Sequence, residues 1–326
     1  MKESNVYITR MIPDKAINYL KEQCRVEVNP EKRAHTRAEL LERVRGRDAV
    51  LSTMQDTIDA EVMDAAGKQC LIFANFAVGY NNVDIPEATK RGIYISNTPD
   101  VLTNATADMA FALMLAVARR IVEGDRLVRP GRFGDWDPFY MLGADVSGKI
   151  AGIVGGGRIG QAFARRARGF DMKVIYTGNS PRPEFEKATG AKFVDFETLL
   201  KEADFVSIHV PLTAATRHMF GARQFSLMKK SAILVNTSRG PVINEPELAD
   251  ALKAGVIYGA GLDVYEREPE VDKGLLGLAN VVLSPHLGSA TLETRENMGL
   301  MAARNIVAAL RGEVPPQCLN PEAARK

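Results

Sequence analysis

The sequence is poor in the residues that usually mark secreted or metal-binding proteins. Its 326 residues include only three cysteines, Cys24, Cys70 and Cys318, which lie far apart and are odd in number. No CxxC pair or Cys/His cluster occurs, so the sequence supports neither a disulfide framework nor a structural zinc site, and we expect no metal. Reduced thiols are expected, which favours a cytoplasmic location.

An excess of one charge and long apolar runs are also missing. The chain has 42 basic and 40 acidic residues, which are interspersed and give a formal net charge of +2. Binding to phosphate backbones requires a concentrated basic stripe, so nucleic acid is not an expected partner. The longest apolar run, residues 109–118, is too short to cross a bilayer, and the first residues contain no apolar targeting stretch. We therefore expect no membrane partner.

What the sequence does contain is a repeated alternation of strand-like and helix-like runs. A chain of this length favours two domains, and the alternation predicts parallel sheets with crossover helices. The expected fold class is α/β, with two doubly wound parallel-sheet domains of Rossmann or flavodoxin-like type. The predicted strands are residues 6–8, 26–28, 49–52, 71–74 and 93–96 in a first series, and 149–154, 173–176, 205–210, 232–236, 258–264 and 280–284 in a second.

The stretch between the two series predicts a long helix followed by a loop. The helix should run from about residue 104 to 122, and the Gly-, Asp- and Pro-rich segment 129–148 should form an extended surface loop with the single tryptophan, Trp136. A last helix is expected over residues 291–310. We expect it to return to the first domain, which gives domains of residues 1–99 plus 288–326 and residues 100–287.

A glycine-rich stretch, IVGGGRIGQ, follows the first strand of the second series. Gly155, Gly157 and Gly160 have the spacing GxGxxG, and a helical run begins directly after them. In this context the glycines permit a tight turn, close approach to a pyrophosphate and close packing of helix on strand, while the helix N-terminus supplies free N–H groups. The stretch predicts a dinucleotide site; the alternative is a tight turn without a ligand.

The following strand ends without the carboxylate that usually binds the ribose hydroxyls of NAD. Its sequence, KVIYTGNSPRP, contains Asn179, Ser180 and Arg182 instead. A carboxylate would repel a 2′-phosphate, whereas an arginine can pair with it. The stretch therefore favours NADP(H), with NAD(H) possible if Arg182 is only a solvated surface residue.

Three polar residues follow predicted strands of the second series: Arg239 in VNTSRGPVI, Glu268 in GLDVYEREP and His286 in SPHLG. An arginine fork can bind the carboxylate of a 2-oxo acid in two places, and a protonated histidine can give a proton to the carbonyl oxygen. A glutamate nearby would favour the protonated ring and orient it. Taken singly, each could be an ordinary loop residue, and Asp263 could equally cap a loop or meet a cofactor amide.

These stretches, together with NFAVGYNNVD, HVPLTAATRH and SPHLGSAT, resemble the D-isomer-specific 2-hydroxyacid dehydrogenases over nearly the whole chain. The resemblance implies that Arg239 binds the substrate carboxylate, that Glu268 orients the histidine and that His286 is the acid/base. It also implies a cleft between the domains, a homodimer built largely from the central domain, and substrate contacts from the backbone amides of Val78 and Gly79. The cofactor contacts it implies, beside the glycines and the 2′-phosphate residues, are Thr106, Arg158, Ile159, Val210, Pro211, Thr216, Thr237, Ser238, Asp263 and Gly288.

Within that family the sequence is most similar to glyoxylate/hydroxypyruvate reductases, including the branch that also reduces 2-ketogluconate. The expected function is NADP(H)-dependent reduction of a small 2-oxo acid to the D-2-hydroxy acid. Two alternatives remain: a 2-ketogluconate reductase with the same residues, and a dinucleotide-sensing protein like the corepressors that share the fold. Asn244 stands where relatives often have aspartate, which could alter a supporting contact.

Overall fold

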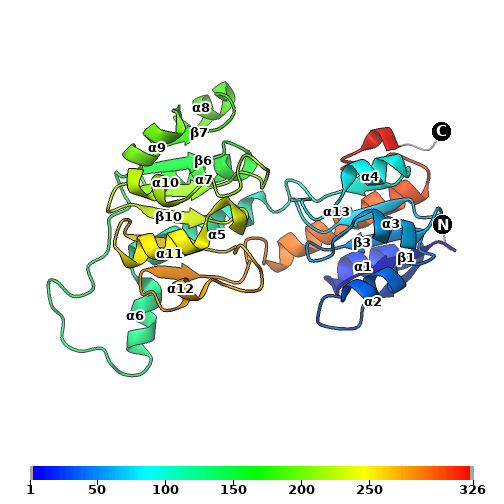
Figure 1. Ribbon diagram of the computed structural model, residues 1–326, viewed down its shortest axis with the longest axis horizontal. Helices are drawn as coiled ribbons and strands as arrows, with labels where there is room; N and C mark the ends of the chain where they lie inside the picture. Colours follow the sequence, from blue (N-terminus) through cyan, green and yellow to red (C-terminus); the bar gives the residue numbers. More distant parts are fainter. Residues whose placement is uncertain (1–2, 324–326) are drawn as a thin grey trace. The chain divides into compact units, whose positions relative to one another are not determined.

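The computed structural model describes residues 3–323, which divide into two compact units (Figure 1). Unit 1 contains the described residues up to Leu102 and those from Ala290 onward, and unit 2 is Thr103–Ser289. The sequence placed the junctions at 99/100 and 287/288. Both junctions lie later in the structure, at 102/103 and 289/290, and at the second the backbone N–H of Gly288 donates to Asp263 of unit 2.

Unit 1 is built on a five-stranded parallel sheet of order β2-β1-β3-β4-β5. Successive residues of its strands face opposite sides, as the strand period of two requires. Leu51 packs against the helices of one face, whereas its neighbour Val50 packs against those of the other. The strands are β1 (Asn5–Ile8), β2 (Arg25–Val28), β3 (Ala49–Ser52), β4 (Ile72–Asn75) and β5 (Tyr94–Ser96).

Helices cover both faces of this sheet. One face carries α1 and the C-terminal α13, which pack against each other and against β3 and β4. The chain end thus returns to the first unit, as the sequence predicts. The helices of unit 1 are α1 (Asp14–Lys21), α2 (Arg37–Arg43), α3 (Ala60–Ala66), α4 (Ile85–Lys90), α13 (Leu292–Leu310) and the short 3-10 helix η2 (Pro321–Ala323).

Unit 2 is built on a seven-stranded parallel sheet of order β12-β11-β10-β9-β6-β7-β8. The first strand, β6, lies between β9 and β7, so the chain winds outward in both directions from this point. The six predicted strands are all present, and the two-residue β8 is one that the sequence pattern did not predict. The strands are β6 (Ile150–Val154), β7 (Lys173–Thr177), β8 (Lys192–Phe193), β9 (Phe205–Ile208), β10 (Ile233–Asn236), β11 (Gly259–Leu262) and β12 (Val281–Leu283).

Both faces of this second sheet are again covered by helices, so the predicted α/β class is confirmed for each unit. On one face α5 and α7 pack against each other and the strands, and α9 to α12 cover the other. The helices are α5 (Thr103–Ala118), α6 (Ile121–Val128), α7 (Arg158–Gly169), α8 (Pro183–Thr189), α9 (Phe196–Glu202), α10 (Ala222–Leu227), η1 (Gly240–Val242), α11 (Glu245–Lys253) and α12 (Lys273–Leu276).

The prediction of one helix over residues 104–122 was wrong, because the structure has two. Arg120 adopts a left-handed conformation, with φ of 53°, and separates α5 from α6. The carbonyl oxygen of Ala118 accepts a hydrogen bond from the N–H of Ala144, 2.8 Å away, in place of a helical partner. A contact distant in sequence therefore ends α5, which the apolar pattern could not indicate.

After α6 the chain forms the extended segment that the sequence predicts. Residues 129–148 contain turns but no helix or strand, and Figure 1 shows the segment leaving the body of unit 2 beside α6. Its side chains include Phe133, Trp136 and Phe139, which are 62%, 80% and 81% exposed. Across residues 3–323, no helix combines the length and apolar character needed to cross a membrane.

Candidate active site

The polar residues singled out in the sequence of unit 2 gather at the carboxyl edge of its sheet. In a parallel sheet all strands end at the same edge, and ligands bind where the winding direction reverses. Here that point lies between β6 and β9, which are hydrogen-bonded neighbours. The glycine-rich stretch follows β6 directly, so the sheet topology places it at the expected ligand position.

Two of the three motif glycines are required by close backbone contacts. Gly155 has φ of 106°, and a Cβ atom there would lie 2.8 Å from the backbone of His209, at the end of β9. A Cβ atom on Gly160 would lie 2.2 Å from the carbonyl oxygen of Gly155. Since any side chain would clash, these glycines let β6, α7 and the β9 loop meet closely.

The third glycine and the start of α7 are instead open. Gly157 is the N-cap of α7 and makes no side-chain cap, and a Cβ atom on it would meet no atom of the described residues within 4 Å. An anion could therefore approach the start of α7, whose first residues are Arg158 and Ile159, from this open side. The hydroxyl of Thr237 is buried with no hydrogen-bond partner among residues 3–323. These features fit a bound dinucleotide.

The segment after β7 borders the glycine loop. The backbone N–H of Arg182 donates to the hydroxyl of Tyr176, 2.6 Å away, and Cδ of Arg182 lies 3.5 Å from where a Cβ of Gly156 would be. Asn179, Ser180 and Arg182 are all exposed. The nearby carboxylate of Glu186 accepts from the Tyr176 hydroxyl at 2.7 Å. The three predicted 2′-phosphate residues are therefore solvent-accessible, and Arg182 lies close to the glycine loop.

Other residues assigned to the cofactor in the sequence lie on neighbouring loops. Val210 and Pro211 follow β9, and the Thr216 hydroxyl donates to the Pro211 carbonyl at 2.6 Å. The Ser238 hydroxyl donates to Asn236 at 2.8 Å. The hydroxyls of Thr216 and Ser238 therefore stabilise the loops to which they belong. Thr106, on α5, has its Cγ2 3.4 Å from the Cβ position of Gly288.

His286 and Glu268 form the central pair of the site. His286 Nδ1 lies 2.8 Å from Glu268 Oε2, and both side chains are partly exposed. The other oxygen of Glu268 accepts from the backbone N–H of Tyr265 at 3.1 Å. Burial alone would raise the pKa of Glu268, but the hydrogen bonds and the charges of His286 and Arg239 lower it below its usual value. Glu268 is therefore a carboxylate that holds the histidine ring by Nδ1, leaving Nε2 for another group.

Arg239 is brought beside this pair by a close contact between two loops. A Cβ atom on Gly240 would lie 1.8 Å from the backbone carbon of Tyr265, so only glycine allows the approach. Asn236 fixes the turn, because its side-chain amide donates to the Arg239 carbonyl at 3.0 Å. Burial lowers the pKa of Arg239, and the negative charge of Glu268 opposes that shift. An arginine, a carboxylate and a histidine thus share one part of the sheet edge.

Asp263 supports the loop that presents His286. Its buried carboxylate accepts three hydrogen bonds, from the Ser284 hydroxyl at 2.5 Å and from the backbone N–H groups of Leu287 and Gly288, both at 2.7 Å. His286 itself has a left-handed backbone, with φ of 55°. These hydrogen bonds show Asp263 as a loop cap, and its contact with the cofactor stays a prediction.

The turn that carries Val78 and Gly79 belongs to unit 1. The side-chain amides of Asn97 and Asn75 donate to the carbonyl oxygens of Val78 and Gly79, at 2.8 and 2.9 Å. Within residues 3–323, the N–H groups of Val78 and Gly79 have no acceptor. The turn is therefore fixed by its carbonyls and offers two free backbone donors.

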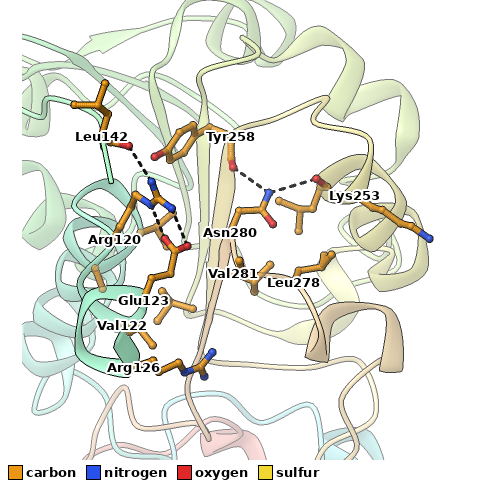
Figure 2. A pocket seen from close by; sticks show the side chains of 15 residues that line it. Arg120, Val122, Glu123, Arg126, Leu142, Lys253, Tyr258, Leu278, Asn280 and Val281 are labelled. Carbon is orange, nitrogen blue, oxygen red and sulfur yellow. Dashed lines mark hydrogen bonds and ion pairs between the residues drawn. The ribbon is translucent and has the colours of Figure 1, made fainter. Parts of the chain in front are cut away.

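A cavity of about 470 Å³ in unit 2 lies at the opposite edge of the sheet. Tyr258 and Asn280, which line it, immediately precede β11 and β12. In Figure 2 Arg120 is paired with Glu123, at 2.7 Å, and the ammonium of Lys253 points away from that pair. The charged groups do not converge on one point, so we assign the site to the carboxyl edge.

Several supporting residues lie inside the motif stretches, but the sequence alone does not single them out. Gly240 adjoins Arg239, Tyr265 lies between Asp263 and Glu268, and Ser284 opens SPHLG. Their roles depend on contacts between different loops, which spacing along the chain does not reveal. Asn244, noted as a departure, caps α11 by accepting from the N–H of Glu247 at 3.3 Å.

Comparisons with known proteins agree with this geometry. Residues 111–288 match the family model of the D-isomer specific 2-hydroxyacid dehydrogenase NAD-binding domain. The chain is 53% identical to a glyoxylate reductase of Thermococcus litoralis, over 97% of this chain and 96% of that one.

Solved structures extend the likeness. A Thermus thermophilus protein superposes with a TM-score of 0.91 at 44% identity, covering 97% and 99% of the two chains. An NADPH-dependent glyoxylate/hydroxypyruvate reductase of Sinorhizobium meliloti, in complex with NADP and malonate, gives a TM-score of 0.86 at 30% identity, covering 99% and 98%. The chain belongs to the D-isomer-specific 2-hydroxyacid dehydrogenase family.

Proposed function

We propose that this enzyme reduces a small 2-oxo acid, glyoxylate or hydroxypyruvate, to the D-2-hydroxy acid with NADPH as the preferred cofactor. The observation that carries the proposal is the Glu268–His286 pair, 2.8 Å apart, on the same sheet edge as Arg239 and the glycine loop. An acid, its orienting carboxylate and a cation for the substrate are the groups that this reduction needs.

Each of the three residues has a defined task in this scheme. His286, held through Nδ1, gives the proton on Nε2 to the carbonyl oxygen of the substrate. Glu268 stabilises the protonated ring and fixes its orientation. The planar fork of Arg239 binds the substrate carboxylate and so aligns the neighbouring carbonyl. When bound, the nicotinamide cofactor supplies the hydride that completes the reduction.

The residues that would hold the cofactor are those around the glycine loop. The uncapped start of α7 would bind the pyrophosphate, and the unpaired Thr237 hydroxyl would find a partner on the ligand. Arg182, beside Gly156 and without a carboxylate at the end of β7, supports a 2′-phosphate and hence NADPH. The named S. meliloti relative, which binds NADP, is consistent with that preference.

The size of the substrate is inferred from the relatives. Glyoxylate reductases about half identical to this chain support a small oxo acid. The free N–H groups of Val78 and Gly79 would give its carboxylate a second set of donors. The alternative, 2-ketogluconate, would use the same acid and base but require more room around Gln55, the turn at 76–80 and the loop at 136–142.

We also propose that the enzyme is a homodimer that buries the extended segment. Helix α6 has no buried residue, and Ile121 and Val128 on it are each 56% exposed. Trp136 and Phe139, on the segment that follows α6, are 80% and 81% exposed, and so many exposed large apolar side chains in neighbouring segments favour a surface that another chain covers. Light scattering should give a dimer for the parent chain and a monomer for Trp136→Glu/Phe139→Glu.

Initial rates test the function directly. NADPH and NADH should each be measured against glyoxylate, hydroxypyruvate, pyruvate and 2-ketogluconate by loss of absorbance. Preference for NADPH with glyoxylate or hydroxypyruvate supports the proposal. Faster turnover of 2-ketogluconate would favour the bulkier substrate. Tight dinucleotide binding without turnover of any acid would favour a sensing protein and refute the proposal.

A substitution of Arg182 tests the cofactor preference. Arg182→Ala should weaken NADPH binding without changing NADH binding, because only NADPH carries the 2′-phosphate. Arg168→Ala, at the far end of α7 where the side chain donates to Ala188, is the matched control. Equal NADPH dissociation constants for Arg182→Ala and the parent would remove Arg182 from the phosphate site.

A further inference from the structure

A second histidine–carboxylate pair includes a residue of the Glu268 loop and has no task in the scheme above. His218 Nε2 lies 2.6 Å from Glu266 Oε1, and Glu266 precedes Glu268 by two residues. His218 ends the stretch HVPLTAATRH, between β9 and α10. The ring and the carboxylate are 40% and 22% exposed, so the pair is partly open to solvent.

The backbone of His218 is also held by hydrogen bonds. Its φ is 51°, in the left-handed region that residues other than glycine adopt only when their surroundings impose it. Its N–H donates to the Pro241 carbonyl at 2.8 Å, and two residues later the N–H of Phe220 donates to Val242 at 3.1 Å. His218 is therefore anchored to the segment that directly follows Arg239 and Gly240.

The other end of the pair is anchored to the loop of Glu268. The N–H of Glu266 donates to the carboxylate of Glu245, a buried residue at the start of α11. The adjacent residue, Tyr265, donates its N–H to Glu268. The hydrogen bond between His218 and the Glu266 side chain thus limits movement of the adjacent Tyr265 peptide, which donates to Glu268.

We propose that His218 is a positioning residue for this reaction, which joins the loop bearing Arg239 to the loop bearing Glu268 through its bond to Glu266. The proposal rests on the roles given above to Glu268 and His286. His218 touches none of the reacting groups. It acts by holding Glu268 at the distance from His286 that keeps the imidazole ring in place.

The first test compares two variants of His218 in the full-length enzyme. His218→Leu removes the donor, whereas His218→Gln keeps an N–H that can reach Glu266. Both carry a Cβ and the same left-handed backbone, so their difference reports the bond to Glu266. His218→Leu should lower kcat about tenfold, in the range of couplings between contacting residues, while the dissociation constant for NADPH changes less than about twofold.

The conservative variant should recover most of this loss. His218→Gln should bring kcat back to within about threefold of the parent, and Glu266→Gln should behave like His218→Leu. A kcat of His218→Leu equal to the parent would overturn the proposal. A lower melting temperature with unchanged kcat and KM would also overturn it, because the bond would then serve stability alone.

A double-mutant cycle tests whether His218 acts through Glu268. In a Glu268→Gln background, adding His218→Leu should lower kcat no further, since the residue to be positioned is already altered. An equal tenfold loss in both backgrounds would contradict the proposal. If Glu268→Gln itself turned over like the parent, the proposed role of Glu268 would fail. If it were impaired while His218→Leu was normal, only the role of His218 would fail.

Discussion

The two sheets are both parallel and doubly wound, but they differ in the residues at the ends of their strands. In unit 1 the strand ends lead to neutral or fully bonded groups: Asn75 and Asn97 hold carbonyl oxygens of one turn, and the buried Asp56 accepts from Thr9 and Thr53. In unit 2 the same edge carries Arg239, Glu268 and His286. The comparison teaches that this fold supplies an edge where loops meet, and that the loop residues determine the chemistry.

Buried carboxylates illustrate the difference further. Asp56 in unit 1 and Asp263 in unit 2 each accept three hydrogen bonds inside the molecule. Asp56 holds the loop of Gln55, which has no proposed part in proton transfer, whereas Asp263 holds the loop that presents His286. The same local feature, a buried carboxylate that accepts hydrogen bonds from its loop, stabilises structure in one unit and holds the proposed acid in the other.

The largest expected effect comes from removing the acid of unit 2. His286→Ala should lower kcat roughly 10²- to 10⁴-fold, because it removes the proposed proton donor, and should leave the dissociation constant for NADPH nearly unchanged. The control is His35→Ala in unit 1, whose ring bonds to Tyr7 at 2.6 Å. Stopped-flow rates and fluorescence titration measure both quantities. Lost NADPH binding with chemistry preserved would reverse the assignment.

A smaller loss is expected when the cation is changed but not removed. Arg239→Lys should raise the KM for the oxo acid by about 10- to 100-fold, since an ammonium cannot bind a carboxylate at two points. Arg267→Lys, in the adjoining loop, is the control and should behave like the parent. Steady-state kinetics in glyoxylate at saturating NADPH would decide; an unchanged KM for Arg239→Lys would place the carboxylate elsewhere.

The cap of the histidine loop gives the third prediction. Asp263→Asn loses one acceptor for the Leu287 and Gly288 N–H groups, so kcat should fall about tenfold or more while NADPH still binds. Ser284→Ala removes only the 2.5 Å hydroxyl bond and should have a smaller effect. Weaker NADPH binding with unchanged kcat would instead indicate that Asp263 contacts the cofactor.

Unit 1 should respond more weakly and only in substrate affinity. Asn97→Ala frees the Val78 carbonyl, so the turn loosens and the KM for the oxo acid should rise about fivefold, the value of one ordinary hydrogen bond. Thr98→Val is the matched control, because the buried Thr98 hydroxyl has no partner among residues 3–323. Equal KM values for the two variants would exclude this turn from substrate binding.

The last prediction concerns stability at acid pH. Burial lowers the pKa of His209 from 6.5 to about 3, so the folded enzyme keeps this ring neutral while the unfolded chain protonates it. The unfolded state then binds more protons, and the free energy of unfolding should fall as the pH drops from about 6.5 towards 3. Denaturant unfolding of His209→Asn should show a smaller loss in that window. An equal fall in the free energy of unfolding for the parent and for His209→Asn would contradict this prediction.

Much of this protein was determined by local sequence. Alternating apolar runs predicted eleven of the strands, because a period of two and flanking turn residues act within a few neighbours, and the GxGxxG spacing predicted the turn that Gly155 and Gly160 form. Arg239, Glu268 and His286 could be singled out because each lies in the loop that follows a buried strand, and the sheet brings the ends of its strands together.

Only the tertiary structure decided how those residues are held. The end of α5 at Ala118, the loop cap by Asp263, the contact of Gly240 with Tyr265 and the His218–Glu266 bond all join segments that are distant along the chain. Such contacts depend on which loops lie close together in the folded chain, and the spacing of residues along the sequence does not show this. The sequence therefore identified the groups for the reaction, while packing between loops set their geometry.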